Sequence, residues 1–552
     1  MARVATVAFD RADALRRLAD ETFDVVVVGG GITGAGCALD AASRGFRTAL
    51  VERDDFASGT SSKSSKLVHG GLRYLQQHDV ALVYEGLAER QLALRNAPHL
   101  VRLLPFLIPI LSRDGLVDRR VARGLGAALW MYDLTGGLRI RKAHRRVDRD
   151  GALGLMPTLR PETLASAYLY YDAQADDARL TLCLARTAAA RGAVVANRVE
   201  VAGVTKGPDD NVRAVTARAD GVELTVRTRV VVNATGVWAD ALRALDEGSH
   251  PESIRPAKGI HLTVPWAKVR NKIGVIVPVP RDRRSVFVVP WGDFTYVGTT
   301  DTDYDGPLDD PQSTPEDVEY LLRALNRALA VPVGVDDICG TWAGLRPLRR
   351  TASSERTADL SRRHGIRVST SGMITVTGGK LTTYRRMAAQ TIDQAARLLG
   401  TRRKCRTRRL PLLGADGFVV PDPGGEPSVH DHLGGRYGSE AEGVLALLRA
   451  DPQRREPLVP GLPYVRGEAI YAVRHEMATT LDDVLSRRTR ARLLARDASR
   501  AAALDVARLL APELGWDDAR VAREADEYRA SCDRERTSAQ LPETALDASL
   551  GA

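Results

Sequence analysis

The feature that most constrains the fold is a run of valines followed at once by glycines near the start of the chain. Residues Phe23–Val28 read FDVVVV, which is typical of a strand buried on both faces of a parallel sheet. Gly29, Gly31 and Gly34 follow directly. The small-residue segment Ala35–Arg44 then fits a tightly packed helix. This order of strand, glycine turn and helix predicts a βαβ unit with a dinucleotide-binding turn.

Each glycine has a physical reason in such a turn. The first lets the strand turn sharply into the helix, the second leaves room for a pyrophosphate, and the third lets helix and strand pack closely. The positive end of the helix then attracts the phosphates. Arg47–Glu52 predicts the next strand, and Glu52 at its end is placed to accept hydrogen bonds from a ribose. A chance glycine cluster is disfavoured because the strand, the helix and the acidic residue agree.

The first motif does not distinguish NAD from FAD, but two later segments favour flavin. Val230–Gly236 reads VVVNATG, a hydrophobic strand that ends in a small-residue turn. Val376–Tyr384 reads VTGGKLTTY, two glycines followed by a helix start. A helix end of this kind stabilises negative charge on a reduced flavin. Each segment alone is typical of any strand-to-helix turn, and it is their joint presence with the first motif that favours FAD.

The length of 552 residues predicts two or three domains rather than one core. Strand-like runs in the middle of the chain predict an antiparallel sheet built over the nucleotide domain. The predicted fold class is α/β and α+β, with a Rossmann-type FAD-binding domain, an antiparallel-sheet substrate (cap) domain and a C-terminal helical domain. The expected bounds are 1–400 for the FAD-binding domain with the cap inserted at roughly 90–185 and 255–345, 401–427 for a linker, 428–530 for the helical domain and 531–552 for a loose tail.

The net charge of +10 favours partners that carry negative charge: nucleic acid, anionic lipid or a phosphorylated substrate. Aromatic residues make up 5% and no RNA-binding motif is present, so we predict no nucleic-acid partner. The five cysteines are scattered without a CxxC pair, which indicates reduced thiols in the cytoplasm, and we predict no metal site. No apolar run reaches about 18 residues, so any membrane contact is expected to be peripheral or monotopic.

Six motifs follow one another along the chain: GGGITGAG (Gly29–Gly36), TSSKSSKLVHGGLRYL (Thr60–Leu75), NATGVW (Asn233–Trp238), GTTDTDY (Gly298–Tyr304), GLRPL (Gly344–Leu348) and GGKLTTYR (Gly378–Arg385). Together they resemble one known family, the FAD-dependent (aerobic, quinone-linked) glycerol-3-phosphate dehydrogenases, within the glycine/D-amino-acid-oxidase-like flavoproteins. The resemblance covers roughly residues 20–400 and continues more weakly into Arg474–Arg490. The most specific of the motifs are SSKLVHGGLRYL and GGKLTTYR.

The resemblance implies oxidation of sn-glycerol-3-phosphate at C2 by hydride transfer to FAD, with the electrons then passed to a membrane quinone. It implies substrate contacts at Arg73, Tyr74, Arg346 and Lys380, because a phosphate dianion in a dry pocket requires fixed cations. His261, Arg346 and Lys380 are the expected catalytic residues. His261 is the candidate base for the C2 hydroxyl, and a histidine satisfied within the core is an equal alternative.

The resemblance also implies the contacts to the cofactor. We expect His69 to lie against the flavin. The complete set of expected cofactor-binding residues is Gly29, Gly31, Gly34, Glu52, Thr60, Ser61, Ser65, Lys66, Leu67, His69, Gly70, Ala234, Thr235, Gly236, Trp238, Gly379, Lys380, Leu381 and Thr382.

The stretch Val101–Asp150 holds 11 basic and 5 acidic residues, a net charge of +6, together with apolar Phe106, Leu107, Ile108, Trp130, Met131 and Tyr132. An ordinary helix with a solvated face explains this composition equally well. The family resemblance favours docking on an anionic membrane, at the cytoplasmic face of the plasma membrane. Three alternatives stay open: an oxidase that uses O2, a flavin-containing protein that binds or modifies RNA, and a non-catalytic scaffold. A homodimer is also compatible with the sequence.

Overall fold

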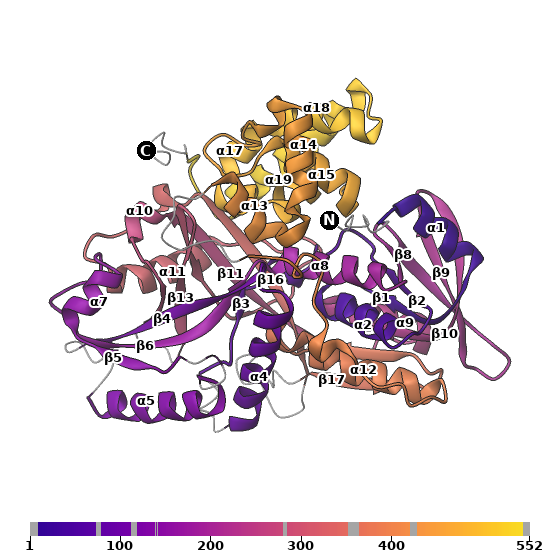
Figure 1. The fold of residues 1–552 in the computed structure, drawn as a ribbon, viewed down its shortest axis with the longest axis horizontal. Coiled ribbons are helices and arrows are strands. Elements are labelled where there is room, and N and C mark those ends of the chain that lie inside the picture. The colour runs from indigo at the N-terminus through magenta and orange to yellow at the C-terminus, as the bar shows by residue number, and fades with distance from the viewer. Residues whose placement is uncertain are drawn as a thin grey trace.

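We describe the protein from a computed structural model, which covers residues 9–72, 79–111, 119–137, 140, 142–279, 284–350, 364–419 and 428–544. Figure 1 shows three parts: a domain built on a parallel sheet, a second large sheet beside it, and a helical domain from the C-terminal part of the chain that lies against both. This arrangement confirms the predicted fold class.

The first sheet contains the predicted βαβ unit. Its central strand β1 (Thr22–Val28) lies parallel to both β2 (Thr48–Val51) and β10 (Val222–Asn233). Strand β1 has a neighbour on each side and helices or strands over each face, so Val25–Val28 are all buried. The remaining strands of this sheet in the described chain are β7 (Val194–Ala196), β8 (Glu200–Lys206), β9 (Val212–Ala219), β17 (Gly365–Val368) and β18 (Ile374–Thr377).

Helices cover this sheet and share its hydrophobic core. Leu410, Leu412 and Leu413, from the segment predicted to be a linker, pack against the same core. Arg403 also donates from Nη1 to the carbonyl oxygen of Gly45 at 2.6 Å. Residues 401–419 therefore pack on the FAD-binding domain, because their leucines find an apolar surface there. The helices of this domain are α1 (Arg11–Asp20), α2 (Ile32–Ser43), α8 (Asp177–Ala190), α9 (Ala239–Glu247) and α12 (Tyr384–Leu398).

The second sheet is antiparallel apart from one parallel pair, β4 with β12. Its long strand β11 (Ile254–Pro265) pairs with β16 (Gly340–Arg349), which places His261 opposite Trp342. The other strands are β3 (Leu67–Val68), β4 (Val101–Leu111), β5 (Arg145–Val147), β6 (Leu164–Ala175), β12 (Gly274–Pro278), β13 (Ser285–Trp291), β14 (Phe294–Gly298) and β15 (Thr302–Asp303).

The apolar residues expected to contact a membrane fall into two groups. Phe106, Leu107 and Ile108 lie in β4 and are buried in the sheet, so they are not available as anchors, which corrects the expectation. Tyr132 is buried as well, whereas Trp130 is 62% exposed. The helices around this sheet are α4 (Val80–Asn96), α5 (Arg119–Tyr132), α7 (Arg149–Leu155), α10 (Trp266–Val269) and α11 (Pro315–Ala328).

Buried ion pairs join the C-terminal helical domain to the FAD-binding domain. Asp55 accepts hydrogen bonds from Arg487 at 2.6 Å and from Arg488 at 2.7 Å, and all three side chains are buried. Helix α19 continues to Ser538, which corrects the loose tail expected from residue 531. The helices are α13 (Val429–Tyr437), α14 (Ala441–Ala450), α15 (Arg466–Glu476), α16 (Ala491–Leu494), α17 (Arg496–Ala501), α18 (Ala503–Leu514) and α19 (Asp518–Ser538). Within the described ranges, no helix is long and apolar enough to cross a membrane.

Candidate active site

The glycine turn after β1 brings the backbone of three segments into close contact. A Cβ atom on Gly34 would lie 1.8 Å from the carbonyl oxygen of Gly29. Gly29 has a φ of +107° and packs against Ala234, where an added Cβ would meet the carbonyl oxygen at 2.7 Å. Gly31 is the N-cap of α2 and makes no side-chain cap. Ser61 Oγ accepts a hydrogen bond from the backbone N–H of Ile32 at 2.9 Å. The remaining N–H groups at the start of α2 form the kind of helix N-terminus that binds a pyrophosphate.

Glu52 lies at the end of β2, as predicted. Its carboxylate accepts hydrogen bonds from the backbone N–H of Gly30 at 2.6 Å and of Asp54 at 2.8 Å. Burial raises the pKa of Glu52 to about 7 despite these two bonds. A carboxylate in a dry setting at the edge of a cavity is a strong acceptor, which suits the hydroxyls of a ribose.

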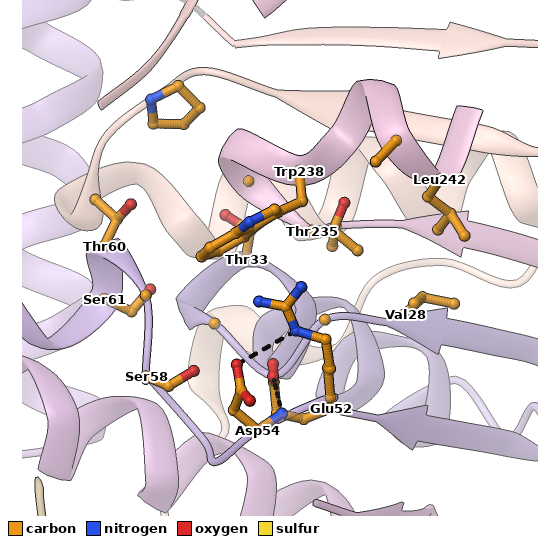
Figure 2. Close-up of a pocket in the computed structure, with 18 of the residues that line it drawn as sticks. Val28, Thr33, Glu52, Asp54, Ser58, Thr60, Ser61, Thr235, Trp238 and Leu242 are labelled. Carbon is orange, nitrogen blue, oxygen red and sulfur yellow. Dashed lines mark hydrogen bonds and ion pairs between the residues drawn. The ribbon is translucent and has the colours of Figure 1, made fainter. Parts of the chain in front are cut away.

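These residues surround a cavity of about 520 Å³, a size typical of cofactor sites. Figure 2 shows Glu52 and Asp54 on one side of it, Thr60 and Ser61 from the η1 turn (Thr60–Ser62) on another, and Trp238 on a third. The expected residues that line this cavity are Gly29, Gly31, Glu52, Thr60, Ser61, Ala234, Thr235, Gly236, Trp238, Gly379, Lys380 and Leu381.

A second cavity of about 190 Å³ adjoins the first and shares Gly379, Lys380 and Leu381 with it. We name it the substrate cavity. It is bounded by the second sheet on one side and by the turn before α12 on the other. The expected residues that line it are Thr60, Ser65, Leu67, His69, His261, Arg346, Gly379, Lys380, Leu381 and Thr382.

His261 is held firmly in the wall of the substrate cavity. Its ring stacks on Trp342 with centroids 4.8 Å apart and planes 8° apart, and its Nε2 lies 2.8 Å from Ser65 Oγ. Its Nδ1 has no hydrogen-bond partner within the described part of the chain. Burial, with further effects from Lys66 and Arg346, holds the pKa of His261 well below 6.5, so the ring is neutral at pH 7.

Arg346 enters the same cavity from β16. Its guanidinium donates to Thr299 Oγ1 and to the carbonyl oxygen of Thr300, both at 3.1 Å, and pairs with Asp301 at 3.1 Å. The GTTDTDY segment thus fixes the orientation of Arg346. Lys380 comes from the turn between β18 and α12 and lines both cavities.

Some expected site residues lie elsewhere. The ammonium of Lys66 forms a buried ion pair with Asp177 at 3.0 Å, and the backbone N–H of Gly70 donates to Tyr132 Oη at 3.0 Å. Neither residue lines either cavity. Gly34 acts through the backbone contact described above. Arg73 and Tyr74 lie outside the described residues.

The sequence reasoning missed several lining residues. Residues 199–202 come from the start of β8 and line the larger cavity, but no motif marks them. Pro347 and Lys63 line the substrate cavity, and they lie inside the GLRPL and TSSKSSK motifs, which is the sequence signal that marks them.

Comparisons with known proteins agree with this geometry. The sequence model of the FAD-dependent oxidoreductase family (DAO) matches residues 24–422, and that of the C-terminal domain of alpha-glycerophosphate oxidase matches residues 405–521. Glycerol-3-phosphate dehydrogenase 2 of Mycobacterium tuberculosis is 42% identical over 97% of this chain and 92% of its own length. The crystal structure of the glycerol-3-phosphate dehydrogenase from Bacillus halodurans complexed with FAD is 30% identical, covers 97% of this chain and 99% of its own, and superposes with a TM-score of 0.76.

The fold and the glycine turn define the protein as an FAD-dependent oxidoreductase. The contacts of Gly29 and Gly34, the N-terminus of α2 and the half-buried Glu52 fit that cofactor. By the extent of its similarity, the chain belongs to the FAD-dependent glycerol-3-phosphate dehydrogenase family.

Proposed function

We propose that the protein oxidises sn-glycerol-3-phosphate to dihydroxyacetone phosphate with FAD and passes the electrons to a membrane quinone. The observation that carries the reaction is the substrate cavity, which adjoins the FAD cavity and brings His261, Arg346 and Lys380 together. Glu52 and the N-terminus of α2 would hold the adenosine and pyrophosphate parts of the cofactor. When bound, FAD supplies a hydride acceptor for the oxidation of an alcohol.

Arg346 and Lys380 bind the phosphate of the substrate. A phosphate dianion in a cavity of about 190 Å³ loses most of its hydration, and fixed cations compensate for that loss. The guanidinium of Arg346 is already oriented by Thr299 and Asp301, so little conformational entropy is lost on binding. The phosphate thereby fixes the position of the C2 carbon.

His261 accepts the proton of the C2 hydroxyl at Nε2, where the substrate replaces the hydrogen bond that Nε2 shares with Ser65 Oγ in the free protein. The ring is neutral in the free protein because burial and two nearby cations lower its pKa, so it has a lone pair for a proton. A bound phosphate dianion offsets the charges of Arg346 and Lys66, and the pKa of His261 rises as a result. Substrate binding and activation of the base are therefore coupled.

Anaerobic bleaching of the flavin tests this reaction. The FAD-loaded protein is mixed with sn-glycerol-3-phosphate or with glycerol, which has the same C2 alcohol and no phosphate. Rapid loss of the flavin absorbance with the phosphate ester alone is expected. Bleaching by glycerol at the same rate would show that the phosphate is not needed for binding. If neither compound bleaches the flavin, sn-glycerol-3-phosphate is not the substrate.

The proposed membrane contact rests on exposed residues of and beside α5, which we call the α5 patch: Trp130, Met131, Leu134, Lys142 and Arg145. Trp130 and Leu134 are 62% and 69% exposed. The ring of Trp130 lies 5.1 Å from that of His144, so the basic segment 142–149 adjoins the helix. Apolar side chains beside exposed cations suit an anionic bilayer at the cytoplasmic face, where quinone dissolves.

Sedimentation with vesicles of anionic or zwitterionic phospholipid tests this contact. Trp130→Asp combined with Leu134→Asp is expected to weaken binding to anionic vesicles at least about 10-fold, because two apolar anchors are lost. Val222→Asp is the matched control, since Val222 is 59% exposed in a hairpin of the FAD-binding domain. Equal binding by the double variant and the control would refute the α5 patch. The electron acceptor is then identified by a second assay. Reduction of a soluble quinone analogue would indicate a quinone, and release of hydrogen peroxide would indicate O2.

A further inference from the structure

A third cavity, of about 590 Å³, lies where all three parts of the protein meet. We name it the junction cavity. Its walls come from the segment after β2, from the chain before α11, from β16 and from the C-terminal helical domain. Figure 1 shows the helical domain lying against both sheets. Neither of the other two cavities accounts for this space.

The arginines that line the junction cavity are committed to carboxylates. Arg487 pairs with Asp55 at 2.6 Å, and Arg492 pairs with Glu535 at 3.0 Å. Arg490 is paired with Asp176 at 2.7 Å. The pairs of Arg487 and Arg490 join the helical domain to the FAD-binding domain, and that of Arg492 lies within the helical domain. These arginines are therefore poorly placed to receive a ligand.

Lys63 differs from these arginines. It follows the η1 turn (Thr60–Ser62) and is half-buried. Its backbone N–H donates to the carbonyl oxygen of Thr60, whereas its ammonium has no hydrogen-bond or ion-pair partner among the described residues. Burial lowers its pKa, and Arg492 and Arg487 lower it further against the opposing effect of Asp310 and Asp482. Lys63 and all four of these charged residues line the junction cavity. A partly desolvated ammonium without an acceptor is costly, and an anion would relieve that cost.

Hydroxyl groups line the same space. Ser313 is 2% exposed and its Oγ has no partner in the described chain. Ser62, Thr480, Ser486 and Ser531 also line the cavity. Hydroxyl groups that both donate and accept suit a ligand that carries hydroxyls of its own.

We propose that the junction cavity is a second ligand site, distinct from the substrate cavity, that binds a small hydroxylated phosphate ester through the ammonium of Lys63 and the hydroxyl of Ser313. The volume of about 590 Å³ admits a sugar phosphate, whereas the substrate cavity of about 190 Å³ suits a three-carbon ester.

The two sites share a wall. Trp342 lines the junction cavity, and its ring stacks on His261 in the substrate cavity. Lys63 also lines both cavities. A ligand in the junction cavity therefore contacts groups that position the candidate base, and its binding changes the surroundings of His261.

Isothermal titration of the FAD-loaded protein with glucose 6-phosphate, and with glucose as the control without charge, tests the proposal. One phosphate ester is expected to bind per chain, and glucose is not. Lys63→Gln is expected to weaken binding about 10- to 100-fold, because a hydrogen bond to a charged group is lost. Lys404→Gln removes the same charge from an exposed position and leaves binding unchanged.

Three further variants locate the bound probe. Ser313→Ala is expected to weaken binding several-fold, and Arg346→Ala, in the substrate cavity, is expected to leave it unchanged. Trp342→Phe is expected to abolish the change in tryptophan fluorescence on binding. Failure of the probe to bind at millimolar concentration would overturn the proposal. Binding that is lost in Arg346→Ala and kept in Lys63→Gln would overturn it too, because the probe would then occupy the substrate cavity.

Discussion

Two glycine substitutions separate the packing of the nucleotide turn from its binding function. A Cβ at position 34 would lie 1.8 Å from the carbonyl oxygen of Gly29, more than 1 Å closer than any normal contact. A Cβ at position 31 would meet Ser61 Oγ at 3.1 Å, the end of a movable side chain. Gly34→Ala must therefore displace α2 from β1, whereas Gly31→Ala fits and fills space beside the cofactor cavity.

The magnitudes follow from these contacts. Overpacking of a rigid core costs about 1–3 kcal/mol and more where the backbone itself must move, so we expect at least about 3 kcal/mol for Gly34→Ala. For a domain of this size that corresponds to a fall in Tm of about 6–12 °C. Gly31 has a φ of −74°, which alanine adopts without strain, so its substitution costs less than about 1 kcal/mol.

Thermal unfolding of the FAD-free proteins and titration with FAD measure the two effects. Gly34→Ala is expected to lower the Tm and to lose FAD binding with it. Gly31→Ala is expected to keep its Tm within about 2 °C and to lose FAD affinity, because the new methyl group stands where the pyrophosphate approaches. The reasoning would be refuted by a Gly34→Ala protein that melts with the unaltered protein and binds FAD normally.

Four further predictions concern the site and the domain contacts. His261→Ala is expected to slow flavin reduction about 10²- to 10⁴-fold at unchanged substrate affinity; equal rates in stopped-flow experiments would exclude it as the base. Arg346→Ala is expected to weaken substrate binding about 10-fold or more with full FAD content, and normal affinity would remove it from the site. Glu52→Ala is expected to lower FAD retention on dialysis, with Glu52→Gln as the milder control, and full occupancy would contradict the ribose contact. Burial would raise the pKa of Asp176, but Arg490 lowers it from the usual 3.8 to about 2. The lowered pKa contributes about 2 kcal/mol to the stability of the protein above pH 4, and this contribution is lost as the pH falls toward 2. Asp176→Asn is expected to abolish this pH dependence of unfolding.

The local features of the nucleotide domain could be predicted closely from the sequence. The valine run, the glycines and Glu52 all lie within about 30 residues of one another, and together they are typical of a single structure, the βαβ unit. Strand β1, helix α2 and strand β2 accordingly begin and end within three residues of the predicted bounds.

Features that depend on distant contacts could not be predicted in this way. By composition alone, Phe106 and Trp130 are equally good candidates for a membrane anchor. The structure shows that Phe106 is buried where β4 pairs with β6, whereas Trp130 is exposed. Lys66 lies in a family motif, yet its partner Asp177 is more than 100 residues away. The segment after residue 401 is rich in Arg, Pro and Gly, which predicts a linker, whereas its few leucines hold it to the core of the FAD-binding domain.

The ion pairs of Asp55 have a consequence for the order of events during synthesis. Asp55 lies three residues after Glu52, and the segment between them forms a wall of the FAD cavity. Its partners Arg487 and Arg488 leave the ribosome more than 400 residues later. Until then Asn197 donates to the carboxylate of Asp55, but the two guanidinium groups that neutralise its charge are missing. We therefore expect tight capture of FAD to be a late, nearly post-translational step, although the glycine turn that receives it is among the first segments to be made.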